Sequence, residues 1–308
     1  MSVSAAPDRQ PAIETRGLGK RYGNGSAPAL ADLDLTVERG EIFGFLGPNG
    51  AGKSTMIRLL LGFLHATTGA ATVLGHDVAR ESVAIRRRVG YLPGGIAFWD
   101  EQSGERVLDE LAALSGHAPV LRSMLLDRLE LSAATLRRPV RAYSRGMRQK
   151  LGIIQALQHD PELAILDEPS EGLDPLMQRA FYAILEERKA AGRTIFFSSH
   201  VLSEVERVCD RVAIIRRGRL VALEDVAGLL TRRKRVVELV VRGPIPRLED
   251  VPGVSDVSID GNRLVCRLEG EVGPFLAAVA GADVVDLAIE PARLEEAFLE
   301  YYEEDAQP

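Results

Sequence analysis

The sequence has 308 residues and a mass of 33.5 kDa, enough for about two domains with buried cores. Its 46% hydrophobic and 27% charged residues are typical of a soluble globular protein, and its net charge of −6 argues against a general nucleic-acid binder. Cys209 and Cys266 lie in no CxxC pattern, so no metal or disulfide framework is expected. No apolar run reaches about 18 residues, so no membrane-spanning segment is predicted.

The first part of the chain is predicted to contain strands joined by turns. Residues 1–11 lack the apolar centre of a signal peptide and are expected to form a flexible tail. Residues 12–41 alternate short apolar segments with glycine turns, a pattern typical of antiparallel strands. A short buried strand is predicted at 41–46, and residues 55–61 have helical character. The glycine-rich stretch Gly47–Thr55 lies between them.

The middle of the chain is predicted to be first helical and then α/β. After strand-like residues 71–75, apolar side chains recur at helical spacing from 103 to about 158. Further along, predicted strands alternate with predicted helices, in the order strand 163–166, helix 176–191, strand 194–197, helix 201–209 and strand 212–215. This alternation predicts parallel strands in a buried sheet.

Near residue 225 the pattern changes to a β-rich α+β unit. Strands are predicted at 236–241, 254–259, 263–268 and 284–289, with helices from Pro274 and at 294–302. The basic run 231–235 is interpreted as a solvated linker, with contact to anionic lipid headgroups as the alternative. The expected organisation is a tail at 1–11, a first domain at 12–225 with a helical part at about 100–158, and an α+β domain at 226–308.

The stretch Gly47–Thr55 fits the spacing G-x-x-x-x-G-K-[ST]. Glycines let the backbone wrap an anion with its N–H groups pointing inward, and the helix that follows adds a partial positive charge. Lys53 is expected to reach the β- and γ-phosphates and Ser54 to ligate Mg²⁺. A glycine turn that binds nothing is the alternative, and the flanking strand and helix argue against it. The predicted phosphate-binding residues are Gly47, Pro48, Asn49, Gly50, Ala51, Gly52, Lys53, Ser54 and Thr55.

Two adjacent acids follow the predicted strand 163–166. At the carboxyl edge of a parallel sheet, Asp167 is expected to hold the metal and Glu168 to polarise an attacking water. The same two acids could instead cap the next helix. The pair alone does not decide between these interpretations.

Four further motifs occur in a fixed order along residues 12–225. Residues 143–149, YSRGMRQ, resemble a signature loop, and residues 170–175, SEGLDP, resemble a D-loop. Residues 198–200, SSH, resemble the strand end that carries a switch histidine, and Tyr22 matches an adenine-stacking aromatic. Taken singly, Tyr22 would more often be a core aromatic and His200 an ordinary polar side chain. Together with the glycine loop and the two acids, these motifs resemble the ATP-binding subunits of ABC transporters.

The resemblance implies a fold and a set of functional residues. The fold is a P-loop NTPase cassette with a RecA-like parallel core, an antiparallel β subdomain and a helical subdomain, followed here by the small α+β domain. Glu168, His200 and Lys53 are implied as catalytic residues, and Ser54 and Asp167 as Mg²⁺ ligands. The implied nucleotide contacts beyond the glycine loop are Tyr22, Ser144, Gly146 and Asp174.

The resemblance also implies partners and a location. Two copies would sandwich two ATP molecules, each copy bringing its signature loop to the other's phosphate. Residues 290–299 are similar to the extension of ATPases that work with ABC-2 type permeases. We therefore expect a homodimer that hydrolyses ATP to ADP and phosphate under a separate integral-membrane permease. It would act in bacterial efflux, at the cytoplasmic face of the membrane, with no nucleic-acid partner.

Two departures from the family pattern stand out. The signature loop carries Arg145 where glycine is usual and Met147 where glutamine is usual, a variation that also occurs in drug- and polyketide-resistance exporters. Gly94 stands where the Q-loop glutamine is expected, which puts the usual contact of that glutamine with Mg²⁺ and the permease in doubt.

Two rival functions are less consistent with the sequence. A soluble ABC ATPase that acts on nucleic acid or ribosomes usually carries two cassettes or a long coiled coil, and this chain shows one cassette without sustained heptads. A nucleotide-gated regulatory protein with little turnover would fit the missing glutamine, but it has no need of a water-polarising Glu168.

Overall fold

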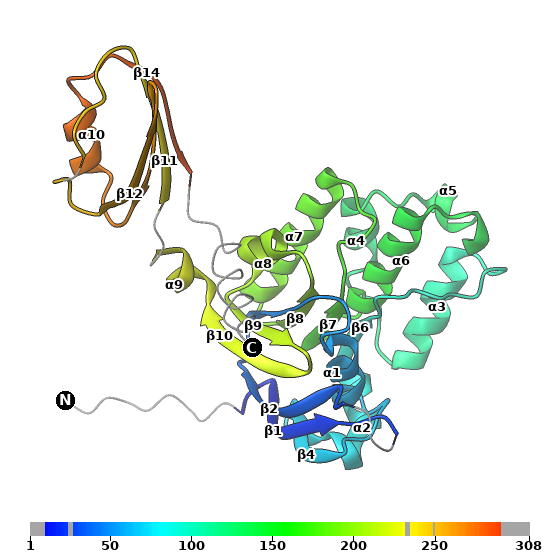
Figure 1. The fold of residues 1–308 in the computed structure, drawn as a ribbon. Coiled ribbons are helices and arrows are strands. Elements are labelled where there is room, and N and C mark those ends of the chain that lie inside the picture. Colours follow the sequence, from blue (N-terminus) through cyan, green and yellow to red (C-terminus); the bar gives the residue numbers. More distant parts are fainter. Residues whose placement is uncertain (1–9, 24–26, 232–234, 249, 291–308) are drawn as a thin grey trace, which may run out of the picture. The chain divides into compact units, whose positions relative to one another are not determined.

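The structure is a computed structural model that describes residues 10–23, 27–231, 235–248 and 250–290 (Figure 1). The chain divides into two compact units, of which the first ends at Leu223 and the second begins at Glu224. The domain limits of 12–225 and 226–308 stay a prediction. The tail at 1–9, most of the basic run and the predicted helix at 294–302 lie outside the described residues.

The first unit contains two sheets. The antiparallel sheet has the order β2-β1-β4-β5, and the second sheet has the order β10-β9-β3-β8-β7-β6, with β9, β3, β8, β7 and β6 paired in parallel. The antiparallel strands are β1 (Ile13–Lys20), β2 (Leu30–Val37), β4 (Thr68–Val73) and β5 (His76–Asp77). Those of the second sheet are β3 (Ile42–Leu46), β6 (Val89–Leu92), β7 (Leu163–Asp167), β8 (Thr194–Ser199), β9 (Arg211–Arg216) and β10 (Arg219–Asp225).

The parallel strands β3, β7 and β8 are buried at every residue. Their continuous apolar runs are what a parallel sheet covered on both faces requires. Helix α1 (Lys53–Leu60) lies between the two sheets, and its Met56 and Ile57 join Phe43 and Phe45 in one core. Helices α7 (Pro175–Ala190) and α8 (Leu202–Val208) pack on β3 and β8 from the other side (Figure 1).

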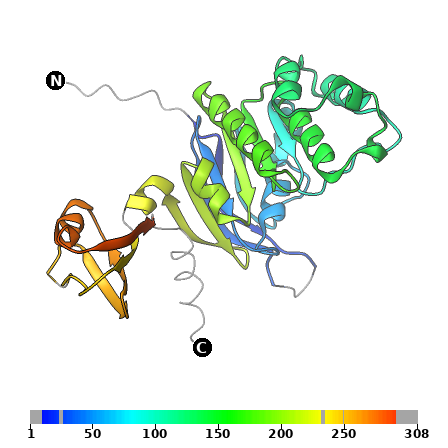
Figure 2. The ribbon, with the colours of Figure 1, turned by 90° about the horizontal axis from the view of Figure 1, so that it is seen from above.

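A helical group follows β6, as the sequence predicts for residues 103–158. Figure 2 shows this green to cyan-green group beside the parallel sheet of the first unit. Serine caps three of its helices: Ser103, Ser132 and Ser144 each accept a backbone N–H, at α3, α5 and α6. The elements are α3 (Gly104–Ser115), α4 (Arg122–Arg128), α5 (Ala133–Leu136), a 3₁₀ turn (Val140–Ala142) and α6 (Arg145–Leu157). The fold class predicted from the sequence, a P-loop cassette, is confirmed for this unit.

Several elements were not predicted. Helix α2 (Val78–Arg88) has only Ile85 buried and ends in three arginines, so it carries little apolar periodicity. Strand β6 has four residues, too few for a clear strand pattern. Strands β5 and β10 and helix α9 (Val226–Thr231) were likewise not expected. Packing against neighbouring elements, more than their own sequence pattern, determines the structure of these segments.

In its described residues, the second unit contains helix α9 followed by an antiparallel sheet on which helix α10 (Gly273–Val279) packs. The strands are β11 (Arg235–Val241), β12 (Val254–Asp260), β13 (Arg263–Leu268) and β14 (Val284–Glu290), in the order β12-β13-β11-β14. Alternate residues of β11, beginning with Val237, pack with Phe275 of α10 in a core of their own. All four predicted strands and the helix near Pro274 are present within a residue or two.

Gly90 lets β6 approach α6. A Cβ atom at Gly90 would lie 2.0 Å from the carbonyl oxygen of Ala156 and 2.7 Å from Pro161 Cγ. Neither backbone atom nor ring can yield without moving the strand or the helix. The side chain of this position is therefore restricted to hydrogen.

Gly90→Ala should lower the free energy of unfolding by about 1–3 kcal/mol, because overpacking forces α6 and β6 apart. The matched control is Gly95→Ala, where an added Cβ meets no atom within 4 Å and about 0.5 kcal/mol or less is expected. Thermal unfolding followed by circular dichroism measures both. Equal midpoints for the two variants would contradict the close packing of β6 on α6.

Candidate nucleotide-binding site

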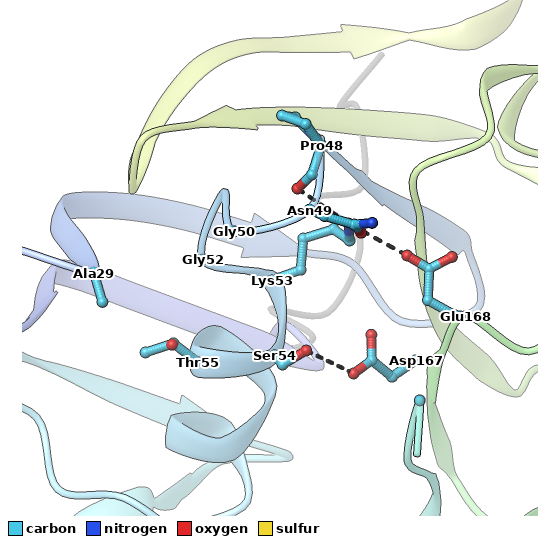
Figure 3. Close-up of a pocket in the computed structure, with 11 residues that line it drawn as sticks. Ala29, Pro48, Asn49, Gly50, Gly52, Lys53, Ser54, Thr55, Asp167 and Glu168 are labelled. Atoms are coloured by element: carbon cyan, nitrogen blue, oxygen red, sulfur yellow. Dashed lines mark hydrogen bonds and ion pairs between the residues drawn. The ribbon is translucent and has the colours of Figure 1, made fainter. Parts of the chain in front are cut away.

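The loop Gly47–Thr55 runs from the end of β3 into α1 (Figure 3). Gly50 and Gly52 have φ angles of 82° and 113°, in the left-handed region that favours glycine. An added Cβ would lie 2.3 Å from the carbonyl oxygen of Ile215 at Gly47 and 2.6 Å from that of Ala29 at Gly52. The loop can wrap this tightly only with glycine at these positions.

Lys53 lies at the first turn of α1 and is only 6% exposed. Its ammonium donates to the carbonyl oxygen of Gly47 at 2.6 Å and to that of Pro48 at 3.4 Å, and it pairs with Glu168 Oε1 at 3.3 Å (Figure 3). The charge is thus held over the loop by backbone oxygens and a carboxylate. A phosphate group offers the same kind of partner.

Asp167 lies at the end of β7 and is buried. Its Oδ2 accepts from the hydroxyl of Ser54 at 3.0 Å, and its Oδ1 accepts from Ser198 of β8 at 3.0 Å. Ser54 and Asp167 therefore bring two hard oxygen ligands together beside the glycine loop, as Figure 3 shows. This donor set suits a divalent cation such as Mg²⁺.

Glu168 is held in an unusual backbone conformation, with φ at 51°. Its N–H donates to the carbonyl oxygen of Ser198 at 3.0 Å, and its Oε2 lies 2.8 Å from His200 Nδ1. Gln149 of α6 donates to the carbonyl oxygen of Pro169 at 2.8 Å and to that of Glu168 at 3.3 Å. Contacts from β8 and α6 thus fix the direction of this carboxylate.

The interpretation of Asp167 and Glu168 as helix caps is wrong. The next helix, α7, begins at Pro175 and is capped by Asp174, whose Oδ1 accepts from the N–H groups of Leu176 and Met177 at 3.0 Å. The two acids instead lie in a cavity of about 330 Å³ at the carboxyl end of the strands. The loop residues Pro48, Asn49, Gly50, Gly52, Lys53, Ser54 and Thr55 line it together with Ala29, Gly94, Asp167 and Glu168.

Tyr22 lies at the mouth of this region and is 46% exposed, so it is no core aromatic. Its hydroxyl is 3.4 Å from Thr55 Oγ1, and the ammonium of Lys20 lies 5.5 Å from the ring centroid. An exposed aromatic face next to the glycine loop can stack on a flat base.

Ser144, Gly146 and Asp174 are not among the residues that line the cavity. Ser144 caps α6 by accepting from the N–H of Met147 at 3.2 Å. A Cβ at Gly146 would lie 2.9 Å from the carbonyl oxygen of Gly172, so the signature-like loop packs against the D-loop-like segment. The guanidinium of Arg145 also forms an ion pair with Glu171 there. Within one chain, Ser144, Gly146 and Asp174 therefore do not line the cavity that contains Lys53.

Some residues of the site went unassigned in the sequence. Gln149 and Ser198 lie within the quoted motifs, yet nothing local indicates that each binds the segment 167–169. Ala29 lines the cavity from the segment before β2 and carries no chemical signal. Gly94 does line the cavity, and an added Cβ there would lie 3.2 Å from Asp167 Oδ2.

Comparison with known proteins shows the family. The family model for "ABC transporter" matches residues 30–171. Over 305 residues, 94% of this chain and 95% of the other, the chain is 36% identical to Daunorubicin resistance ATP-binding protein DrrA3 of Streptomyces coeruleorubidus. The chain belongs to the ABC transporter ATP-binding proteins. It is also 39% identical over 248 residues to a Fluoroquinolones export ATP-binding protein of Mycobacterium tuberculosis, covering 79% of this chain and 80% of that one.

Solved structures of the same family share the fold. One, the ATP binding subunit of an ABC transporter, has a TM-score of 0.65 and 32% identity, and the match covers 71% of this ABC ATP-binding protein and 91% of that chain. The dimeric post-hydrolysis state of a cassette bound to ADP and Pi has a TM-score of 0.64 at 19% identity, covering 70% and 98%. The second likeness supports the fold alone. In both comparisons the fold is that of an ABC cassette.

Lys53→Ala should weaken nucleotide binding about 10- to 100-fold, because a charge-assisted hydrogen bond to phosphate contributes about 1.5–3 kcal/mol. Titration with a fluorescent ATP analogue measures the dissociation constant. The control is Lys189→Ala, because the Lys189 ammonium pairs with Asp210 and Glu186 on the protein surface. The nucleotide affinity of this variant should equal that of the wild type. Unchanged affinity in the Lys53 variant would contradict a phosphate role for the loop.

Proposed function

We propose that this ABC ATP-binding protein hydrolyses ATP to ADP and phosphate and thereby drives export through a separate permease. One observation carries the proposal. Lys53, Ser54, Asp167 and Glu168 meet in a single cavity at the carboxyl end of parallel strands, and His200 binds Glu168 there. Ligands of open α/β sheets bind at this edge.

Binding of ATP would use the loop and Tyr22. The N–H groups of Gly47–Thr55 and the N-terminus of α1 surround the phosphates, Lys53 neutralises the β- and γ-phosphates, and the Tyr22 ring stacks on the adenine. The tight turn at Gly50 and Gly52 supports this role, because it turns successive N–H groups toward one point.

Ser54 and Asp167 would hold Mg²⁺. Both offer oxygen atoms, which this ion prefers, and a Ser hydroxyl with a nearby carboxylate leaves room for phosphate oxygens and water in the coordination shell. When bound, the ion neutralises charge that develops on the γ-phosphate. Ser198 keeps Asp167 aimed at the cavity by binding its other oxygen.

Glu168 would orient and polarise the attacking water, and His200 would stabilise the γ-phosphate. Glu168 Oε1 pairs with Lys53 and Oε2 lies 2.8 Å from His200 Nδ1, so the carboxylate lies between the two side chains that would contact the γ-phosphate. Phosphoryl transfer depends mainly on positioning and charge neutralisation, which this arrangement supplies.

A second copy of the chain would complete each site. Ser144, Gly146 and Asp174 lie outside the cavity of their own chain, the first two at the N-terminus of α6 and Asp174 at that of α7. Such an end can bind an anion through its backbone N–H groups. We propose a head-to-tail homodimer in which these residues face the partner's ATP.

The permease would dock beside the cavity, on a second hollow of about 390 Å³. Apolar side chains line much of it, and Trp99 is 48% exposed. Leu92 and Pro93 line the hollow and the next residue, Gly94, lines the ATP cavity, so a short stretch of backbone would link the phosphate to the hollow. The hollow suits a short amphipathic helix of a membrane protein.

Relatives named for daunorubicin resistance and for fluoroquinolone export support the proposal of export. The described residues contain no helix that is both long and apolar enough to cross a membrane. We propose that the protein acts at the cytoplasmic face of the membrane, under a permease of the ABC-2 type.

Glu168→Gln should bind ATP normally and lose about 10²–10⁴-fold in turnover, because a positioned base contributes that much. The readouts are phosphate release and the dissociation constant of ATP. Glu187→Gln is the control, since that carboxylate pairs with Arg128 on the surface, and its turnover should match the wild type. Near-normal phosphate release from the Glu168 variant would overturn the assigned base.

Ser144→Glu tests the dimer. With ATP and Mg²⁺, we expect the Glu168→Gln protein to be a dimer by size-exclusion chromatography with light scattering. The Glu168→Gln, Ser144→Glu double variant should be a monomer, because the new carboxylate repels the partner's phosphate. The matched control is Ser132→Glu, which also replaces the N-cap serine of a helix but lies outside the signature-like loop. A Ser144→Glu double variant that still dimerises would contradict the assignment.

A further inference from the structure

Glu204 is a buried carboxylate outside the ATP cavity. It lies in the first turn of α8 and is 9% exposed. Its Oε1 accepts from the hydroxyl of Ser170, and its Oε2 accepts from that of Ser199 at 2.7 Å. Both serines are buried too, at 4% and 0% exposure. One carboxylate therefore joins two segments that come from different strands.

The two segments carry the proposed catalytic side chains. Ser170 follows Glu168 by two residues, and Ser199 immediately precedes His200. Glu168 and His200 themselves lie in contact at 2.8 Å. The two segments are thus joined twice, once by the contact of Glu168 with His200 and once by Glu204.

Helix capping does not account for Glu204. An acid at this position often reaches back to the N–H of the N-cap residue. Here the N-cap residue is Val201, and its N–H donates to Ser199 Oγ at 2.9 Å. Both oxygens of Glu204 accept from serine hydroxyls instead, so the contacts of this carboxylate are directed at the two segments.

Burial makes this choice of residue costly. A carboxylate taken out of water must be compensated by hydrogen bonds, and here neutral hydroxyls supply them. Burial first, and then the charge of Glu204, raise the pKa of the neighbouring Tyr182 phenol, which therefore stays protonated. An apolar residue could fill the same space at lower cost, but it could not hold both serines.

We propose that Glu204 is a positioning residue for ATP hydrolysis. By binding Ser170 and Ser199 together, it fixes the distance and direction between Glu168 and His200. The inference rests on the proposed ATPase function, since its kinetic effect requires turnover. Glu204 can act in this way without contacting the nucleotide.

The first experiment measures kcat, KM and the affinity for a fluorescent ATP analogue. Glu204→Ala should lower kcat by about 10²-fold, because small misplacements of reacting groups cost that much, and should leave the affinity within about threefold. Glu204→Gln keeps one acceptor oxygen and gains an NH₂ group that can donate to a serine hydroxyl. This variant should therefore have most of the wild-type kcat. The control is Glu206→Ala in the same helix, with kcat equal to the wild type.

The serines provide variants that keep the carboxylate. Ser170→Ala and Ser199→Ala should each lower kcat less than Glu204→Ala does, and Ser170→Ala should add little in the Glu204→Ala background. If Glu204→Ala fails to fold, Glu204→Gln and the serine variants carry the test. An unchanged kcat in all of these variants, or a fully additive double variant, would overturn the proposal.

A second readout does not depend on turnover. The ¹⁵N and ¹H resonances of the His200 ring, assigned by their loss in His200→Ala, report its contact with Glu168. They should shift in Glu204→Ala and remain in place in Glu206→Ala. Unshifted resonances in Glu204→Ala overturn the positioning role. If the resonances shift in Glu204→Ala but the wild type hydrolyses no ATP, only the proposed function is overturned.

Discussion

The site depends on the parallel registration of β3, β8 and β7. Ser198 pairs with Phe45 on one side and with Asp167 on the other. Its hydroxyl binds Asp167, and its carbonyl oxygen accepts the N–H of Glu168. Because side chains alternate between the two faces of a sheet, a slip of one residue would send Asp167 away from Ser54. The register of three buried strands thus sets the positions of the polar groups.

Buried charge at this edge is compensated group by group. Lys53 has backbone oxygens and Glu168, Asp167 has two serines, and Glu204 has two more. Each interaction replaces water that burial removes. The polar groups consequently form a connected set, so removal of one partner leaves a buried group unsatisfied. Such a set holds its geometry with little freedom, as catalysis by positioning requires.

The sequence predicted those parts whose signal is local. Strands β3, β7 and β8 are continuous apolar runs, and the glycine loop has a spacing with a direct chemical meaning. Strand β6 was not predicted because it is short and packs on β7 and α6, which lie far along the chain, and helix α2 was not predicted because only its Ile85 is buried. The left-handed backbone of Glu168 and its contact with Gln149 likewise arise between distant segments. The link from Glu204 to Ser170 spans 34 residues and has no sequence signature.

The most direct test of the central claim is a crystal structure of the Glu168→Gln protein with ATP and Mg²⁺. The account predicts the γ-phosphate within hydrogen-bond distance of Lys53, with Mg²⁺ at about 2.1 Å from the Ser54 hydroxyl oxygen. It also predicts Ser144 of a second copy against the same γ-phosphate. A nucleotide bound away from the loop Gly47–Thr55, or a triphosphate without contact to Lys53, would contradict it.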